Sequence, residues 1–382
     1  MGTEEGRLRV AVIGSGLAGL TASWMLTRDA GAGADPPAHV ELYESAPSLG
    51  MGTHSVELPE GSDGRPVFVD IPPRFVVPSY YTELLQLYRA IGIPFYLSSG
   101  DGCFQDLRGG SDSAVGSALK PYFRFGNFRL CGFSLPYVLV APWSSTAMKI
   151  LWDLLRFRWR ARKQLAAGEL TGISFGEYLD SQYSVEFGER FAVPVLCVVC
   201  TCSPKAVRAY PADTLVEYWL CWALRGEGLR RAEGGTLSVV SHLSAGLSEC
   251  HLGTSVTALR EGKQRQWLVT DDSGAAREFD HVILATQAKH AASLIGGYCD
   301  SAERRREKAS TRESLRSLAT AVGGVTSEAG EMVLHGDAAA MPVRKGHRLC
   351  LPLPQSVSLF RSRCLTLIVC CDCRRRGAPG QP

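Results

Sequence analysis

Three glycines and one glutamate near the N-terminus have the residue types and spacing of a dinucleotide site. Gly14, Gly16 and Gly19 form a Gly-x-Gly-x-x-Gly pattern, and Glu44 follows at slightly more than the usual interval of about 20 residues. In such a turn the first glycine permits a tight bend, the second lets the backbone approach a pyrophosphate, and the third allows close helix packing. The Glu44 carboxylate would accept hydrogen bonds from a ribose diol, and it disfavours the 2′-phosphate of NADP.

The segments around these residues predict a strand, a turn, a helix and a second strand. Residues 9–13 are a short run rich in β-branched residues, typical of a buried parallel strand. Residues 20–28 favour a helix, whose free N–H groups and dipole would hold phosphate charge. Residues 39–43 form the second strand, which ends at Glu44. A coincidental glycine-rich turn is the alternative, and this order of elements argues against it.

Composition narrows the class of protein. The 382 residues are 45% hydrophobic and 21% charged with a net charge of +3, which is ordinary for a globular protein and too small for nucleic-acid binding. No apolar leader precedes the first strand, and no uninterrupted apolar stretch of about 18 residues occurs, so we expect a soluble, cytoplasmic protein without a membrane span.

The 13 cysteines are expected as reduced thiols. Cys197, Cys200 and Cys202 suggest zinc, but no second ligand pair accompanies them, and we predict no metal.

Further motifs follow in a fixed order. The sequence reads SAPSLGMGTHSV at 45–56, EGGT at 233–236 and DHVILATQA at 280–288. With GSGLAG and ELYES, this order resembles the FAD-binding amine oxidase and phytoene desaturase superfamily, and within it the "predicted NAD/FAD-binding protein" branch. The chain departs from that branch at Met51, where a glycine is usual, and at Ser48, where a basic residue is usual.

The resemblance implies the fold, the domains and the cofactor. We expect a doubly wound, Rossmann-like, three-layer α/β flavin domain, discontinuous over 1–75 and 232–300, with an inserted α+β substrate domain at 76–231. Residues 301–346 would return in part to the substrate domain. FAD is the expected cofactor. The residues that the resemblance places at it are Gly14, Ser15, Gly16, Leu17, Ala18, Gly19, Glu44, Ser45, Gly50, Met51, Thr53, His54, Val256, Ala285 and Thr286.

The same resemblance implies an oxidation. A C–H bond next to an amine, or in a lipid-like substrate, would give a hydride to the flavin. No lysine or other base lies in a motif that assigns it a catalytic role. Two alternatives stay open: a non-catalytic relative that kept the fold, such as a lipid-binding escort protein or a truncated inactive form, and an NAD-dependent dehydrogenase. The oligomeric state is not indicated.

Three later segments complete the sequence predictions. Residues 143–166 predict a helix that is apolar first and basic later, and its part at 156–163, RFRWRARK, is the most cationic stretch of the chain. This part is either a solvated face or a contact for anionic lipid headgroups. Ser174 and Glu177 predict a capping box. Residues 347–382 have five cysteines and no amphipathic pattern, so we expect an aberrant or disordered tail; a zinc knuckle of Cys364, Cys370, Cys371 and Cys373 is the alternative.

Overall fold

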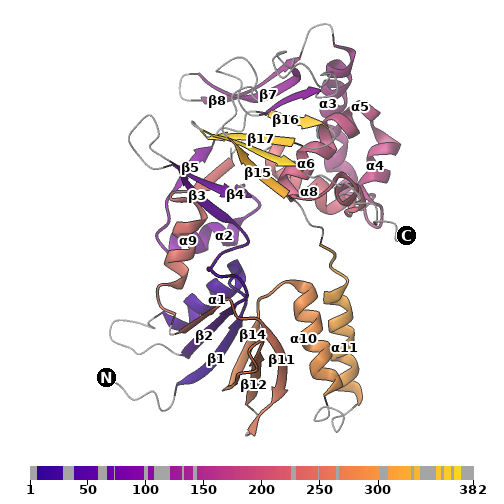
Figure 1. Cartoon of the computed structure of the whole chain (residues 1–382). Coiled ribbons are helices and arrows are strands. Elements are labelled where there is room, and N and C mark those ends of the chain that lie inside the picture. The colour runs from indigo at the N-terminus through magenta and orange to yellow at the C-terminus, as the bar shows by residue number, and fades with distance from the viewer. Residues whose placement is uncertain are drawn as a thin grey trace, which may run out of the picture. The chain divides into compact units, whose positions relative to one another are not determined.

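The computed structural model divides the chain into two compact units (Figure 1). Unit 1 comprises Met1–Ser55, Ile91–Ile93 and Gly234–Ser327, and unit 2 comprises Val56–Ala90, Pro94–Glu233 and Glu328–Pro382. The structure describes residues 7–28, 38–58, 67–72, 74–98, 102–106, 121–130, 133–140, 144–224, 229–247, 249–263, 266–301, 309–327, 331–335, 350–353, 357–362 and 365–370.

A parallel four-stranded sheet forms the centre of unit 1. Its strands are β1 (Leu8–Ile13), β2 (Ala38–Glu44), β10 (Glu249–Leu252) and β14 (His281–Leu284), in the order β10-β2-β1-β14. The β-branched run predicted as a strand lies at its centre, with both faces buried. Helix α1 (Leu17–Thr27) connects β1 to β2, as a parallel crossover requires.

Different layers cover the two faces of this sheet. Helix α1 packs against β1 and β2 and beside α9 (Gly235–Ser244). On the other face lies an antiparallel sheet of β11 (Val256–Glu261), β12 (Trp267–Asp271) and β13 (Ala276–Phe279), whose Val256, Val269 and Phe279 pack against Ala11 and Ile13. The predicted Rossmann-like, three-layer α/β fold is confirmed, and the antiparallel pair of β12 and β13 forms part of one of its layers.

A buried carboxylate on β2 links this strand to three other strands of unit 1. Glu41 on β2 is 1% exposed, and its carboxylate accepts hydrogen bonds from Arg9 of β1 (2.7 Å), Arg277 of β13 (3.0 Å) and His251 of β10 (3.0 Å). Burial raises the pKa of Glu41, but the hydrogen bonds and the two guanidinium charges outweigh it and hold the pKa below its usual value. This network ties the parallel sheet to the antiparallel layer.

Helices α10 (Ala288–Asp300) and α11 (Ala309–Gly323) pack against each other within unit 1. We expected residues 301–346 to return in part to the substrate domain, and within them α11 groups with unit 1, because it packs against α10. Residues 56–75, expected in the flavin domain, group with unit 2. The division into a flavin domain and a substrate domain stays a prediction.

A helical bundle forms one part of unit 2. It contains α3 (Ser145–Ala166), α4 (Phe175–Gln182), α5 (Val185–Phe187), the π-helix η1 (Gly188–Ala192), α6 (Val193–Cys200), α7 (Pro204–Ala209) and α8 (Ala212–Leu224). The predicted capping box starts α4: Ser174 Oγ accepts from the Glu177 N–H at 3.2 Å, and Glu177 Oε2 accepts from the Ser174 N–H at 2.7 Å. Trp219 of α8 is fully buried, and its ring stacks on Phe187 and lies 4.7 Å from the ring of Phe157.

Strands and helix α2 (Thr82–Ala90) form the other part of unit 2 that the structure describes. A seven-stranded sheet contains β15 (Glu331–His335), β18 (Leu365–Cys370), β17 (Val357–Ser362), β16 (Cys350–Leu353), β6 (Gly102–Asp106), β7 (Pro121–Leu130) and β8 (Phe133–Val140) in that order. Strand β3 (His54–Leu58) pairs with β4 (Val67–Ile71), and β5 (Phe95–Ser98) pairs with β9 (Leu229–Ala232). Helix α2 lies between β4 and β5 in the chain.

Three of these strands, β16 to β18, fall within residues 347–382, where we expected an aberrant or disordered tail. The expectation of an aberrant or disordered tail is not tested by these strands and stays a prediction. The cysteine side chains of the zinc-knuckle alternative lie outside the described residues. Cys197, Cys200 and Cys202 lie around the end of α6 and form no disulfide in the part of the chain that the structure describes. None of the helices described there combines the length and the apolar character needed to cross a bilayer.

Candidate dinucleotide-binding site

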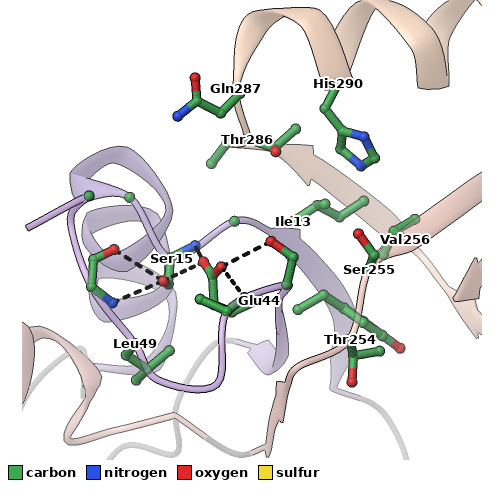
Figure 2. Close-up of a pocket in the computed structure, with 18 of the residues that line it drawn as sticks. Ile13, Ser15, Glu44, Leu49, Thr254, Ser255, Val256, Thr286, Gln287 and His290 are labelled. Carbon is green, nitrogen blue, oxygen red and sulfur yellow. Dashed lines mark hydrogen bonds between the residues drawn. The ribbon is translucent and has the colours of Figure 1, made fainter. Parts of the chain in front are cut away.

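One cavity of about 380 Å³ lies where the four parallel strands of unit 1 end (Figure 2). Gly14 to Gly16 follow β1, Glu44 ends β2 and is followed by Ser45 and Ala46, Thr254 to Val256 follow β10, and Ala285 to Gln287 follow β14. In open α/β sheets, ligands bind at the carboxyl ends of the strands, where connections leave in opposite directions. Here β1 has β2 on one side and β14 on the other, so the cavity lies at such a point.

The glycine turn has the close contacts that its sequence predicts. Gly14 has a φ of +104°, and a Cβ at this position would lie 2.6 Å from the carbonyl oxygen of Ala285. A Cβ on Gly19 would lie 2.0 Å from the carbonyl oxygen of Gly14, so this glycine lets α1 approach the strand end. At Gly16 the nearest atom to an added Cβ is 3.7 Å away, and this glycine lines the cavity. The turn is therefore a cradle with room for a ligand beside Gly16.

Glu44 accepts hydrogen bonds from the protein on both carboxylate oxygens. Oε2 accepts from the N–H of Ser15 at 2.9 Å and from its hydroxyl at 2.5 Å, and Oε1 accepts from the Ala46 N–H at 2.8 Å and the Ser45 hydroxyl at 3.3 Å. Burial raises the pKa of Glu44, but these donors outweigh it and hold the pKa below the usual value. Glu44 is consequently an anion at neutral pH, with its position fixed by backbone N–H groups.

The hydroxyl of Ser15 connects the glycine turn to the loop after β2. Ser15 is fully buried, and besides Glu44 its Oγ lies 3.2 Å from the carbonyl oxygen of Gly50 and accepts the Gly50 N–H at 3.1 Å. Dashed lines in Figure 2 mark these bonds. The one proton of this hydroxyl can point to Glu44 or to the carbonyl oxygen of Gly50. When it points to Gly50, Glu44 Oε2 can accept a hydrogen bond from a ligand hydroxyl in its place.

Most of the predicted site residues line this cavity. Those that do are Gly14, Ser15, Gly16, Glu44, Ser45, Gly50, Thr53, Val256, Ala285 and Thr286. Leu17, Ala18 and Gly19 form the first turn of α1, and Met51 lies in the adjoining loop, outside the cavity lining. His54 begins β3, and its side chain lies outside the described residues. The assignment of these residues to a cofactor stays a prediction.

Several lining residues carry no local signal in the sequence. Ser255 and Thr254 come from the turn after β10, and Gln287 and His290 come from the start of α10 (Figure 2). Tyr43 also lines the cavity, and its ring stacks on His251 at 4.4 Å. These lining residues share their place in the sheet. Tyr43 lies at the carboxyl end of a parallel strand, and each of the others comes shortly after such an end. That rule could have found them once the strands were predicted.

The glycine cradle, the anionic Glu44 and the open start of α1 fit the ADP part of a dinucleotide. Helix α1 begins at Gly16 with no side-chain cap, so no side chain competes there with a phosphate for the first-turn N–H groups. These features define a Rossmann-like dinucleotide-binding domain. A family model for an NAD(P)-binding Rossmann-like domain matches residues 12–91, which include the glycine turn, β2 and Glu44.

Solved structures extend the comparison to most of the chain. A redesigned putrescine oxidase has a TM-score of 0.57 at 15% identity, over 96% of this chain and 76% of the oxidase. A protein of Exiguobacterium assigned to the protoporphyrinogen oxidases has a TM-score of 0.52 at 15% identity, over 97% of this chain and 77% of its own. An oxidoreductase of Methanosarcina mazei has a TM-score of 0.51 at 17% identity, over 86% of this chain and 68% of its own.

At these low identities the similarity establishes a shared fold, and the substrates named belong to those proteins. The resemblance to the amine oxidase superfamily that the motifs indicated is thereby confirmed for the fold. The sequence has no match among curated proteins.

Proposed function

We propose that this chain is an FAD-dependent oxidoreductase of the amine oxidase type. The observation that carries the proposal is the cavity of unit 1, where the ends of all four parallel strands meet the glycine turn and Glu44. The structural neighbours with this fold are oxidases and oxidoreductases, which supports redox chemistry. The substrate class that we propose is an amine or a lipid-like small molecule.

The residues of unit 1 would bind and orient the cofactor. The N–H groups around Gly16 would hold the pyrophosphate, and Glu44 would accept hydrogen bonds from the ribose diol. Val256 and the Ala285-Thr286 turn would enclose the adenine side of the cavity. Once bound, FAD supplies a hydride acceptor for a C–H bond of the substrate, and the protein contributes binding, orientation and exclusion of water.

The loop after β2 favours FAD over NAD. Residues 48–53 fold back so that the Gly50 N–H reaches Ser15 Oγ, and this places Ser48, Gly50 and Thr53 at the same cavity as the glycine turn. Among the motifs that resemble the flavoprotein superfamily, the motif of this loop and the strand before Ala285-Thr286 are the two that favour FAD over NAD. NADP is disfavoured because Glu44 would repel a 2′-phosphate.

The first test is the visible absorption spectrum of the purified chain, before and after heat release of the ligand. We expect flavin bands and the release of FAD. If the protein is purified without a cofactor, titration with FAD, NAD⁺ and ADP separates the candidates by affinity. The proposal predicts that FAD binds most tightly, and tighter binding of NAD⁺ than of FAD would contradict it. Glu44→Gln should bind FAD more weakly, because the ribose diol would lose its carboxylate acceptor. The matched control Glu278→Gln, on the exposed side of β13 and outside the cavity lining, should bind FAD like the wild type.

A non-catalytic relative of this fold is the second candidate. It is favoured by the four protein donors around Glu44, which satisfy this carboxylate without any ligand. A folded protein that remains colourless when FAD is added would support this candidate and would contradict the first.

A further inference from the structure

Helix α3 of unit 2 has two opposite apolar faces. One face, with Ala147, Ile150, Phe157 and Ala161, is at most 2% exposed and packs into the core of the bundle. The other carries four large apolar side chains in solvent: Met148 is 52% exposed, Trp152 65%, Leu155 56% and Trp159 74%. We call these four residues the α3 stripe. An ordinary surface helix buries its one apolar face, so the second face needs a separate explanation.

The spacing of the stripe aligns its side chains. The four positions are four, three and four residues apart, and at about 100° per residue they lie within an arc of about 60°. The stripe therefore runs for about 16 Å along one line of the helix surface. Single exposed apolar residues are ordinary, but a contiguous row with two tryptophans marks an interaction surface.

Cations surround this row. Helix α3 contains six basic residues and one acidic residue, Asp153, which is buried and bonded to Arg156 at 2.8 Å. Arg158, Arg162 and Lys163 are exposed within about 80° of the stripe, and among the described residues no ion pair engages them. The Lys163 ammonium lies 5.0 Å from the centre of the Trp159 ring, so apolar and cationic groups are interleaved.

This combination matches the surface of an anionic bilayer. Tryptophan prefers the boundary between headgroups and acyl chains, since its ring is apolar and its N–H is polar. Basic side chains beside it would contact phosphate and carboxylate headgroups, each contributing to the attraction. A folded protein partner would need an acidic rim around an apolar groove, whereas a bilayer offers both components over any area.

We propose that the α3 stripe and its flanking cations dock this protein onto the surface of an anionic lipid bilayer, with the helix parallel to the membrane plane. The helix already packs on its opposite face, so it would lie on the bilayer without leaving the bundle. The proposal is independent of the cofactor and of the proposed oxidation. A substrate held in or near lipid would nevertheless be delivered at such a surface.

The test is co-sedimentation of the full chain with vesicles of phosphatidylcholine, alone or mixed with phosphatidylserine. We expect binding to the mixed vesicles that weakens at high salt. The variant Trp152→Ser with Trp159→Ser should bind at least about tenfold more weakly. The variant Arg158→Gln, Arg162→Gln and Lys163→Gln should lose the preference for phosphatidylserine.

The matched control is Leu318→Ser with Val325→Ser, which removes two apolar residues of unit 1 that are 49% and 61% exposed. This control should bind within about twofold of the wild type. Circular dichroism checks that each variant is folded. Quenching of tryptophan emission by brominated lipid, lost with Trp152→Phe and Trp159→Phe, would place the stripe at acyl-chain depth.

Three outcomes would overturn the proposal. In the first, the wild type binds mixed vesicles no better than neutral ones. In the second, the stripe variant binds like the control. In the third, the wild type is an oligomer without vesicles and the stripe variant is a monomer, which would make the stripe an interface between copies of this chain.

Discussion

At the scale of single residues, one buried hydroxyl determines how Glu44 can meet a ribose. Ser15 Oγ lies 2.5 Å from the carboxylate and 3.2 Å from the carbonyl oxygen of Gly50, and it has one proton for both. A ribose hydroxyl that donates to Glu44 would replace the Ser15 proton, which would then turn to Gly50. Ser15 is thus a positioning residue whose hydroxyl keeps a bond in both states.

Ser15→Ala is expected to weaken FAD binding by roughly tenfold, because it removes a charge-assisted hydrogen bond and frees the Gly50 N–H. The measurement is a titration of FAD followed by flavin fluorescence. Ser314→Ala, which removes a hydroxyl on the exposed surface of α11, should leave the affinity unchanged. Equal affinities of the wild type and Ser15→Ala would show that this hydroxyl does not position Glu44.

Gly16 and Gly19 are expected to respond differently to alanine. Gly19→Ala would place a Cβ 2.0 Å from the Gly14 carbonyl, so the free energy of unfolding should fall by several kcal/mol, or the chain should not fold. In Gly16→Ala the nearest atom to the added Cβ would be 3.7 Å away, so the free energy of unfolding should not change. The added methyl group would occupy the cavity and reduce the affinity for FAD. Urea unfolding and FAD titration measure the two effects. Loss of stability in Gly16→Ala, with normal FAD binding, would contradict this assignment.

At the scale of elements, Glu41 holds β2 to its neighbours. Its side chain is buried, while the side chains of Arg9 and Arg277 are half exposed and reach it from β1 and β13. A carboxylate in this position is stable because three donors surround it. If one of these strands moved away, the buried charge would lose a partner and the fold would lose stability. The network therefore specifies the register of the antiparallel layer on the parallel sheet.

Glu41→Gln is expected to lower the free energy of unfolding by about 2 kcal/mol, less than for a fully buried pair since both arginines remain partly in water. Glu249→Gln is the matched control, because Glu249 is exposed and shares Arg277 with Glu41. That control should cost at most about 0.5 kcal/mol. Equal losses in the two variants would show that burial of Glu41 is not important. Urea unfolding monitored by circular dichroism gives both values.

The stability difference between the wild type and Glu41→Gln is expected to depend on pH. The folded state holds the pKa of Glu41 below its ordinary value of 4.5, so the stabilisation is complete above that pH and is lost as the pH falls through the lowered pKa. Between pH 7 and pH 5 the difference between the wild type and Glu41→Gln should stay constant, and it should shrink in more acidic solution. A difference that already shrinks between pH 7 and pH 6 would contradict this assignment.

At the scale of the molecule, the predicted cofactor residues all belong to unit 1, and the aromatic core around Trp219 belongs to unit 2. A ligand that binds only the folded state stabilises it by about 2.7 kcal/mol at a concentration one hundred times its Kd. Hydrogen exchange with and without FAD should therefore show its strongest protection in the turn after β1 and in residues 44–50. Strongest protection in α4 to α8 would contradict the site.

Much of unit 1 could be predicted because its requirements are local. Gly14 and Gly19 stand where a side chain would collide with backbone, and such positions are visible in the sequence as glycines. The run of β-branched residues in β1 and, in unit 2, the capping box at Ser174 likewise depend only on neighbouring residues. The grouping of α11 with unit 1 could not be predicted, since it depends on packing against α10.

The sequence by itself determined the class of the first domain, because glycine spacing, apolar runs and a terminal acid describe the backbone path that a pyrophosphate and a ribose need. Only the tertiary structure decided which donors hold Glu44, and that Thr254, Gln287 and His290 meet the glycine turn at one cavity. It also decided which face of α3 is buried. In a helix with apolar residues on two sides, the pattern is the same whichever side meets the core, and only packing leaves Trp152 and Trp159 in solvent.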